Sequence, residues 1–92
     1  MDKLKKFIRS IILESNKAVS KLEIEYQSTK TKEKREDIWK LITILTENNQ
    51  LLLSVCLLPK SELKNFRYEI KKSTEQNDKI SKFINEKKYY YQ

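Results

Sequence analysis

Apolar side chains recur every three or four residues along the first third of the chain. They stand at Leu4, Ile8, Ile11, Ala18, Leu22 and Tyr26, with Phe7, Ile12, Val19 and Ile24 on the flanks. This spacing places them on one face of an α-helix. The pattern predicts an amphipathic helix over residues 3–27. The polar run at residues 14–16 leaves open a division of this segment into two shorter helices.

A second amphipathic segment follows a polar connector. Its apolar face is formed by Ile38, Leu41, Ile42, Leu45, Leu52 and Cys56, with Trp39 at the edge. The pattern predicts a helix over residues 32–57, with a polar soft spot at residues 46–50. Since a proline disfavours the α conformation of the residue before it, Pro59 is expected to end this helix near Leu57.

The last third of the chain carries Leu63, Phe66, Ile70, Ile80, Phe83 and Ile84 at helical spacing. A single helix would carry its apolar stripe through Ser73 and Asn77, and two polar core positions favour a break instead. Ser73 followed by Gln76 is also typical of a capping box. The sequence therefore predicts separate helices over residues 60–72 and 74–87.

These segments indicate an all-α protein, an antiparallel four-helix bundle, with a bundle of three long helices running up, down and up as the alternative. The composition agrees, because the chain has no glycine and one proline, whereas tight β-hairpins depend on glycine or Asn-Gly. At 92 residues the chain is expected to form one domain over residues 1–92. Residues 88–92 are expected to form a flexible tail.

The residue types that support most catalytic and metal sites are missing. The chain has no histidine and one cysteine, Cys56, which together cannot build a tetrahedral zinc site. Without glycine it also lacks a phosphate-binding loop. We therefore expect a protein that is not an enzyme and needs no cofactor. Cys56 is interpreted as a small core side chain in a reducing, cytoplasmic setting.

No apolar run approaches the roughly 20 residues of a membrane span, and no secretory signal is visible, so the chain is expected to be soluble. The net charge is +7, and it lies toward the two ends of the chain: +3 in residues 1–30, zero in 31–59 and +4 in 60–92. Such a surface suits nucleic acid, an anionic membrane or an acidic protein.

Two basic segments are the candidates for these partners. One is a helical stripe formed by Lys60, Lys64, Arg67 and Lys71. Because Glu62 and Glu69 interrupt it, a solvated helix face is favoured over nucleic-acid binding. The other is the amphipathic start of the chain, where Lys3, Lys5, Lys6 and Arg9 stand beside Leu4, Phe7 and Ile8. That segment is suited to an anionic lipid surface, although its apolar side is first expected in the bundle core.

The C-terminal residues are the third candidate site. Tyr89, Tyr90 and Tyr91 cannot all face a core, since consecutive helical positions differ by about 100°. Tyrosine is suited to protein interfaces. Packing against the bundle and contact with a partner both remain open for this tail.

The C-terminal third resembles the immunity proteins that protect lactic acid bacteria from their own pediocin-like bacteriocins. The similar residues are Ser73 to Gln76, Lys79, Ile80, Phe83 and the tyrosine tail, together with Pro59 at a helix start. The chain departs from the family in a short segment between Pro59 and Gln76 and in lacking a glycine before the last helix.

The resemblance implies a cytoplasmic four-helix bundle that associates with the inner face of the membrane and with the sugar-transporter receptor held by the bacteriocin. It also implies a monomer whose C-terminal half selects the bacteriocin. The partner-binding residues would then be Lys82, Lys87, Lys88, Tyr89, Tyr90 and Tyr91. The alternative function is a small helical adaptor, phage- or secretion-associated, which would self-associate through spare apolar surface.

Overall fold

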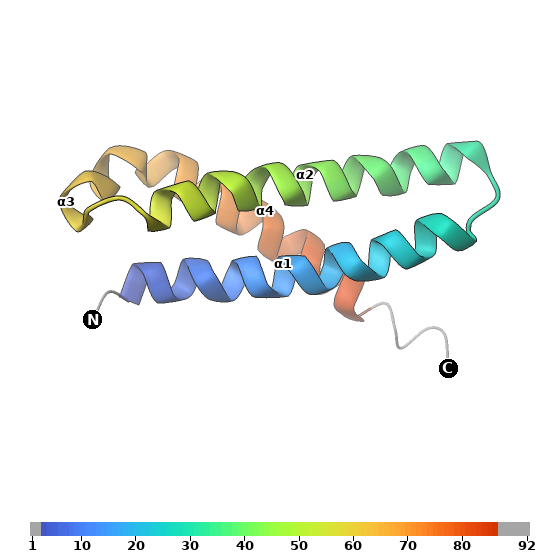
Figure 1. Ribbon diagram of the computed structural model, residues 1–92, viewed down its shortest axis with the longest axis horizontal. Helices are drawn as coiled ribbons and strands as arrows, with labels where there is room; N and C mark the ends of the chain where they lie inside the picture. The colour runs from blue at the N-terminus through green and yellow to red at the C-terminus, as the bar shows by residue number, and fades with distance from the viewer. Residues whose placement is uncertain (1–2, 87–92) are drawn as a thin grey trace.

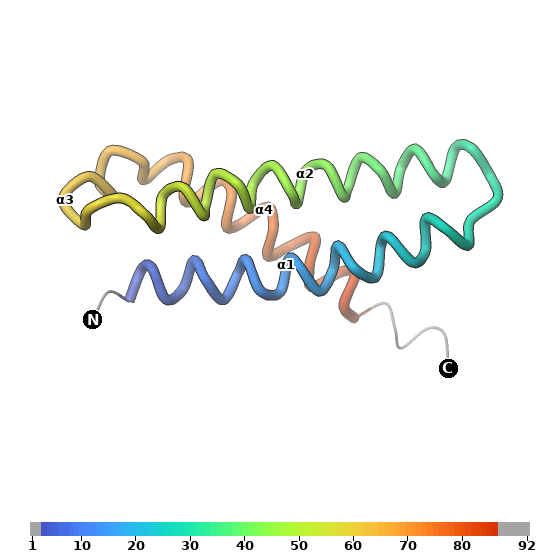
Figure 2. Tube along the Cα trace, viewed as in Figure 1, coloured from blue at the N-terminus to red at the C-terminus, as the bar shows by residue number. Residues whose placement is uncertain are grey.

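The computed structural model of the chain describes residues 3–86, and all the regular structure in that range is helical. Three long helices are joined by a three-residue connector and by a short helical corner (Figures 1 and 2). The elements are α1 (Lys3–Ser28), α2 (Lys32–Cys56), α3 (Lys60–Leu63), the 3₁₀ turn η1 (Lys64–Phe66) and α4 (Arg67–Glu86).

Helices α1 and α2 lie side by side and antiparallel, and α4 runs obliquely across one face of the pair (Figure 1). The molecule is elongated, with principal extents of 48 × 25 × 17 Å. One end holds the start of α1, the end of α2 and the α3 corner; the other holds the α1–α2 connector (Figure 2). This architecture confirms the all-α prediction and is closer to the three-helix alternative.

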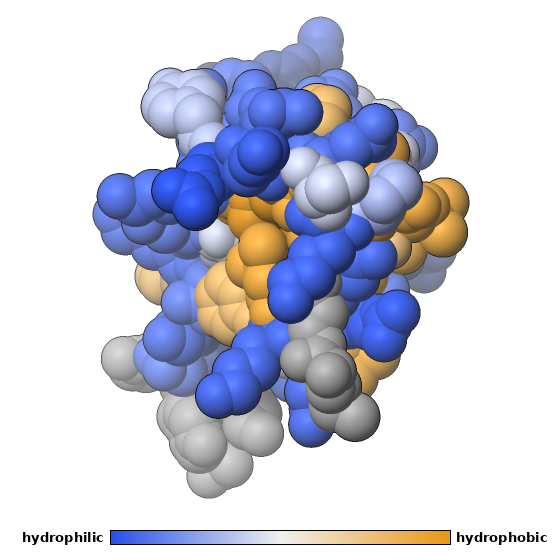
Figure 3. All heavy atoms as spheres, turned by 90° about the vertical axis from the view of Figure 1, so that its left-hand side faces the viewer, coloured by the Kyte–Doolittle hydropathy of each residue, from blue (hydrophilic) through white to orange (hydrophobic). Residues whose placement is uncertain are grey.

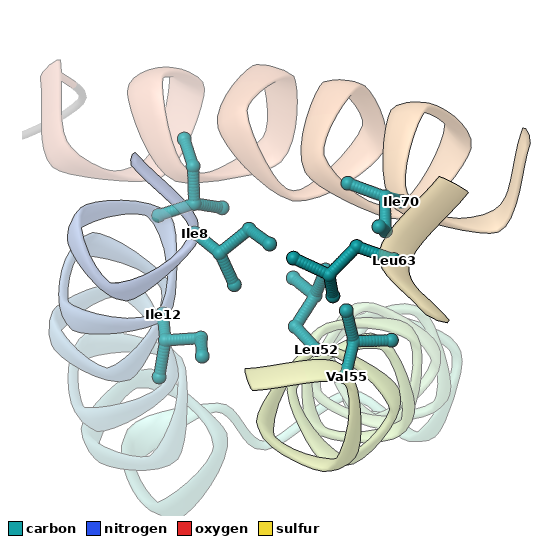
Figure 4. Packing of buried hydrophobic residues seen from close by; sticks show 7 residues of the cluster. Ile8, Ile12, Leu52, Val55, Leu63 and Ile70 are labelled. Carbon is teal, nitrogen blue, oxygen red and sulfur yellow. The ribbon is translucent and has the colours of Figure 1, made fainter. Parts of the chain in front are cut away.

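The buried apolar side chains form two clusters, one toward each end. The corner cluster consists of Ile8, Ile11, Ile12, Leu52, Val55, Leu63 and Ile70, and Figure 4 shows its labelled members pointing toward one another from α1, α2, α3 and α4. The turn cluster consists of Ala18, Leu22, Ile38, Ile42, Leu45 and Ile84. Most of the predicted apolar positions are thus buried, while Cys56 is only half-buried beside the corner cluster.

The predicted break at Ser73 is wrong, because α4 is continuous through it. Ser73 does not begin a helix, so the capping box is not formed. Ser73 and Asn77 are buried inside α4. The segments at residues 14–16 and 46–50, interpreted as possible interruptions, also lie within unbroken helices.

A layer of polar side chains explains why these positions tolerate burial. It lies between the two apolar clusters and takes members from each long helix: Ser15, Asn16, Asn48, Asn49, Ser73, Asn77 and Ser81. The Asn77 amide donates to Asn49 Oδ1 at 3.0 Å and to the Leu45 carbonyl at 3.3 Å, and its Oδ1 accepts from the Asn48 amide at 2.9 Å. The buried members of this layer thus meet polar groups on a neighbouring helix, which offsets their desolvation. Thr74, also buried, donates instead to the Ile70 carbonyl of its own helix.

The chain turns without glycine, and no residue from 3 to 86 has a positive φ. After α2, the backbone amides of Leu57 and Leu58 donate to the carbonyls of Ser54 and Val55. Pro59 then starts α3 with φ −60° and ψ 148°. The predicted end of α2 before the proline is confirmed.

Candidate functional site

The start of α1 and the α3 corner meet at one end of the molecule, which we call the basic end. Lys3, Lys6 and Arg9 are exposed along the first two turns of α1. The first turn of α1 contains no acidic residue, so the lysines add to the positive potential of the helix N-terminus instead of neutralising it.

Lys5 ties α1 to the corner. Its ammonium donates a hydrogen bond of 2.8 Å to the carbonyl of Leu58. That carbonyl lies just past the end of α2, where carbonyl groups lack helical partners. Lys5 therefore has a structural contact, whereas the other three cations of the predicted membrane-surface segment extend toward solvent.

The second basic segment lies beside the first. Lys60, Lys64 and Arg67 line a small pocket of about 180 Å³ together with Leu4 from α1 and Leu63. Lys71, the fourth member of the predicted stripe, instead lines a separate hollow with Tyr68. The fold thus brings together two segments that the sequence presented as separate candidates for different partners.

The basic end carries almost all of the net charge. Residues 3–9 and 57–67 hold seven cationic groups and one carboxylate, a net +6, whereas the whole chain has +7. Exposed apolar side chains lie among these charges, namely Leu4, Phe7 and Leu57. Figure 3 shows this end as an apolar area framed by hydrophilic residues.

The exposure of these apolar residues differs from the sequence prediction. Leu4 and Phe7 were first expected to pack in the core, yet Phe7 is about half-exposed at 49%, and Leu57 is 87% exposed. The core below is already filled by Ile8, Ile11 and Val55. Leu4, Phe7 and Leu57 therefore remain at the surface of the basic end.

One of the predicted partner-binding residues lies in the structure, and the rest fall outside it. Lys82 is exposed on α4 and forms an ion pair of 3.2 Å with Asp78, one turn earlier. Lys87, Lys88, Tyr89, Tyr90 and Tyr91, as well as the predicted tail over residues 88–92, lie outside residues 3–86.

Another hollow lies at the opposite end, beside the α1–α2 connector, and we call it the turn pocket. Its volume is about 560 Å³, and its lining residues are Tyr26, Lys30, Lys32, Arg35, Glu36, Trp39 and Lys40. Only the edge position of Trp39 signalled it in the sequence. Arg35 and Trp39 are one helical turn apart and share a face, but Tyr26 reaches them only because the connector folds α1 back onto α2.

Across residues 3–86 there is no group of three His, Cys, Asp or Glu side chains placed to hold a metal ion. The acidic residues Glu33, Glu36 and Asp37 are exposed near the start of α2. None of the helices in this range has the length and apolar character that a membrane crossing requires.

Comparison of the chain with models of protein families, with curated proteins and with solved structures finds no match.

Proposed function

We propose that the protein is a non-catalytic binding protein that attaches to an anionic membrane surface through its basic end. The observation that carries this proposal is the convergence of the two basic segments beside Leu4, at an end of the molecule that also exposes Phe7 and Leu57. Neither segment alone combines so many cations with so much exposed apolar surface.

The expected binding energy comes from two terms that act together. Each lysine or arginine near an anionic lipid surface contributes about 1 kcal/mol. An exposed leucine or phenylalanine gains about 1.5–3 kcal/mol when it is fully buried in an apolar environment. Since a shallow insertion buries these side chains only in part, attachment is expected to be peripheral and reversible.

The resemblance to the pediocin-like bacteriocin immunity proteins gives this proposal its specific form. The protein would act as a monomer at the cytoplasmic face of the membrane and recognise the receptor complex held by the bacteriocin. Lys82, Lys87, Lys88 and the tyrosines at 89–91 would contact that partner. The basic end would supply the membrane contact, and the C-terminal segment the choice of bacteriocin.

Sedimentation with lipid vesicles tests the membrane contact. The chain is expected to bind vesicles rich in phosphatidylglycerol and not to bind vesicles of phosphatidylcholine. The Lys6→Glu, Lys64→Glu double variant should lose most of this binding. The Lys32→Glu, Lys40→Glu variant has the same net charge but is altered at the other end, so it should retain binding. Equal loss in both variants would mean that net charge alone, and not the basic end, directs the protein to lipid.

Binding to anionic lipid and binding to nucleic acid both weaken as the salt concentration rises. A second variant is therefore needed to distinguish them. Leu57→Ser removes an apolar side chain that is almost fully exposed, so it should weaken vesicle binding without lowering the melting temperature. A phosphate backbone gains nothing from this leucine. Duplex DNA binding tighter than vesicle binding, and unchanged by Leu57→Ser, would contradict the membrane proposal.

The immunity role has its own test. A bacteriocin-sensitive Gram-positive strain that expresses the chain is challenged with a panel of pediocin-like bacteriocins, and survival is counted. Protection against one or a few members is expected, and it should be lost when residues 87–91 are replaced. Survival no better than that of the parent strain, with folded protein present, would reject the immunity role.

The alternative of a helical adaptor is favoured by other exposed apolar side chains, such as Leu53 near the end of α2. An adaptor with spare apolar surface is expected to form dimers in solution, whereas an immunity protein is expected to be a monomer. Analytical ultracentrifugation of the purified chain discriminates the two.

A further inference from the structure

The turn pocket is built around three side chains of the kinds that dominate protein–protein binding energies, namely tryptophan, tyrosine and arginine. Trp39 is 58% exposed on α2, although a tryptophan has more apolar surface to bury than any other residue. The adjacent turn cluster is filled without it. Trp39 is therefore available to a ligand without any change in the core.

The three side chains hold one another in place. The rings of Tyr26 and Trp39 lie 6.1 Å apart at an interplanar angle of 52°, within the range of favourable aromatic pairs. The Arg35 guanidinium lies 4.5 Å from the centre of the Tyr26 ring, in a cation–π arrangement. A guanidinium held against a ring loses less conformational freedom when it binds a carboxylate, so the pocket is partly organised before a ligand arrives.

Positive charge predominates around the two rings. Lys30, Lys32, Arg35 and Lys40 line the pocket with a single carboxylate, Glu36. Three lysines and a forked arginine donor surround an aromatic floor, so a fitting ligand has acidic groups next to an apolar or aromatic group.

We propose that the turn pocket binds an acidic segment of a protein partner in which carboxylates flank one aromatic or branched aliphatic side chain. That side chain would pack against Trp39 and Tyr26, and the carboxylates would pair with Arg35 and the lysines. The proposal is independent of the membrane contact, because the two surfaces lie at opposite ends of the α1–α2 pair. Helix α1 has 26 residues, so the basic end and the turn pocket lie about 39 Å apart along it.

The geometry favours a peptide segment over other anionic ligands. Single-stranded nucleic acid is bound along grooves in which successive bases stack on successive rings. Here the rings form a single pair, and Glu36 lies among the cations. Small molecules are held in clefts that bury most of their surface, whereas these lining residues are mostly exposed. A macromolecular partner can cover such a shallow site with its own surface.

Selection from a displayed library of random peptides tests the proposal, with the full-length chain immobilised as the target. Selected peptides are expected to carry Asp or Glu on both sides of an aromatic or branched aliphatic residue. A synthetic peptide of the selected sequence is then titrated against the free chain. Since Trp39 is the only tryptophan, its fluorescence should change as the site fills.

Two variants and two matched controls locate the binding. Trp39→Ala and Arg35→Gln are each expected to lower the affinity for the selected peptide about thirtyfold, the size of a hot-spot effect. Tyr68→Ala removes a more exposed ring on α4, at 72%, and Lys64→Gln removes a cation at the basic end. Both should leave affinity unchanged. Isothermal titration measures all four, and melting curves show that each variant is folded.

Three results would overturn the proposal. The first is a selection that yields no peptide with acidic residues. The second is a selected peptide that binds Trp39→Ala and Arg35→Gln as tightly as the parent chain. The third is an oligo-dT strand that quenches Trp39 more strongly than any selected peptide and loses affinity in Trp39→Ala, which would assign the pocket to nucleic acid.

Discussion

The two apolar clusters and the buried members of the polar layer between them hold the helices together by different means. Leu45 and Leu52 are excluded from water and gain free energy from removal of apolar surface, whichever apolar neighbour covers them. Asn77 is also fully buried, but its amide is stable there only because Asn49, Asn48 and the Leu45 carbonyl meet it. Apolar packing tolerates approximate neighbours, whereas the polar layer requires particular ones.

A charge placed in either apolar cluster should cause the largest loss of stability. Leu52→Asp in the corner cluster and Ile42→Asp in the turn cluster each bury a carboxylate without a partner. Both variants are expected to lose cooperative thermal unfolding, followed by circular dichroism at pH 7. An unchanged melting curve for either one would show that its side chain is not in the core.

Truncation of a cluster side chain should cost less, but still a large part of the total stability. Leu45→Ala is expected to lower the free energy of unfolding by about 2–5 kcal/mol, where a small domain has on the order of 5 kcal/mol in total. Leu57→Ala is the matched control, since its side chain is almost fully exposed and its loss should leave stability within about 0.5 kcal/mol. Urea unfolding measures both.

The polar layer should respond differently to single and paired substitutions. Asn77→Leu removes the donor to Asn49 Oδ1 and one of the two acceptors of the Asn48 amide, which keeps Gln76, at an expected cost of about 1–3 kcal/mol. Replacing Asn49 by leucine as well removes this acceptor, and part of the lost stability should return. If the double variant loses more free energy of unfolding than the two single variants together, the layer is stabilised by more than these hydrogen bonds.

The smallest effect is expected at the edge of the layer. Ser81 Oγ donates to Ser15 Oγ at 3.4 Å, a long bond, while Ser15 Oγ donates to the carbonyl of Ile11 within its own helix. Ser15→Ala and Ser81→Ala should each change the free energy of unfolding by less than about 1 kcal/mol, since alanine also raises helix propensity. A loss well above that in urea unfolding would extend the layer to include this pair.

The sequence predicts the apolar clusters well and the polar layer poorly, for a physical reason. Ile8, Ile42 and Leu52 recur with a helical period, and an apolar side chain can be assigned to a core without knowledge of its neighbour. Ser73 and Asn77 were interpreted as a break because, within their own segment, they are polar residues on an apolar face. Their partners lie about 30 residues away on α2, and nothing in the local pattern indicates this alignment.

The candidate surfaces were also predictable within each segment but not in how the segments meet. The cations at residues 3–9 and the stripe from Lys60 were each recognisable as helical faces. Their meeting at one end, however, depends on the Pro59 corner and on the α1–α2 pairing. Trp39 was placed at the edge of an apolar face, and the turn pocket required Tyr26 from the preceding helix. Lys82 was predictable as an exposed cation, and its spacing of four residues from Asp78 in one helix is the spacing at which such ion pairs form.

The polar layer also has a consequence for the alignment of the helices along their axes. If the inner faces of α1 and α2 were uniformly apolar, α4 could slide along them by one turn, about 5.4 Å, at little cost. Such a shift would carry the Asn77 amide away from Asn49 and toward leucine and isoleucine side chains. A misaligned bundle would then contain several buried amides without partners, each costing about 1–3 kcal/mol. We expect the asparagines to contribute less to the strength of the fold than to the choice of a single register.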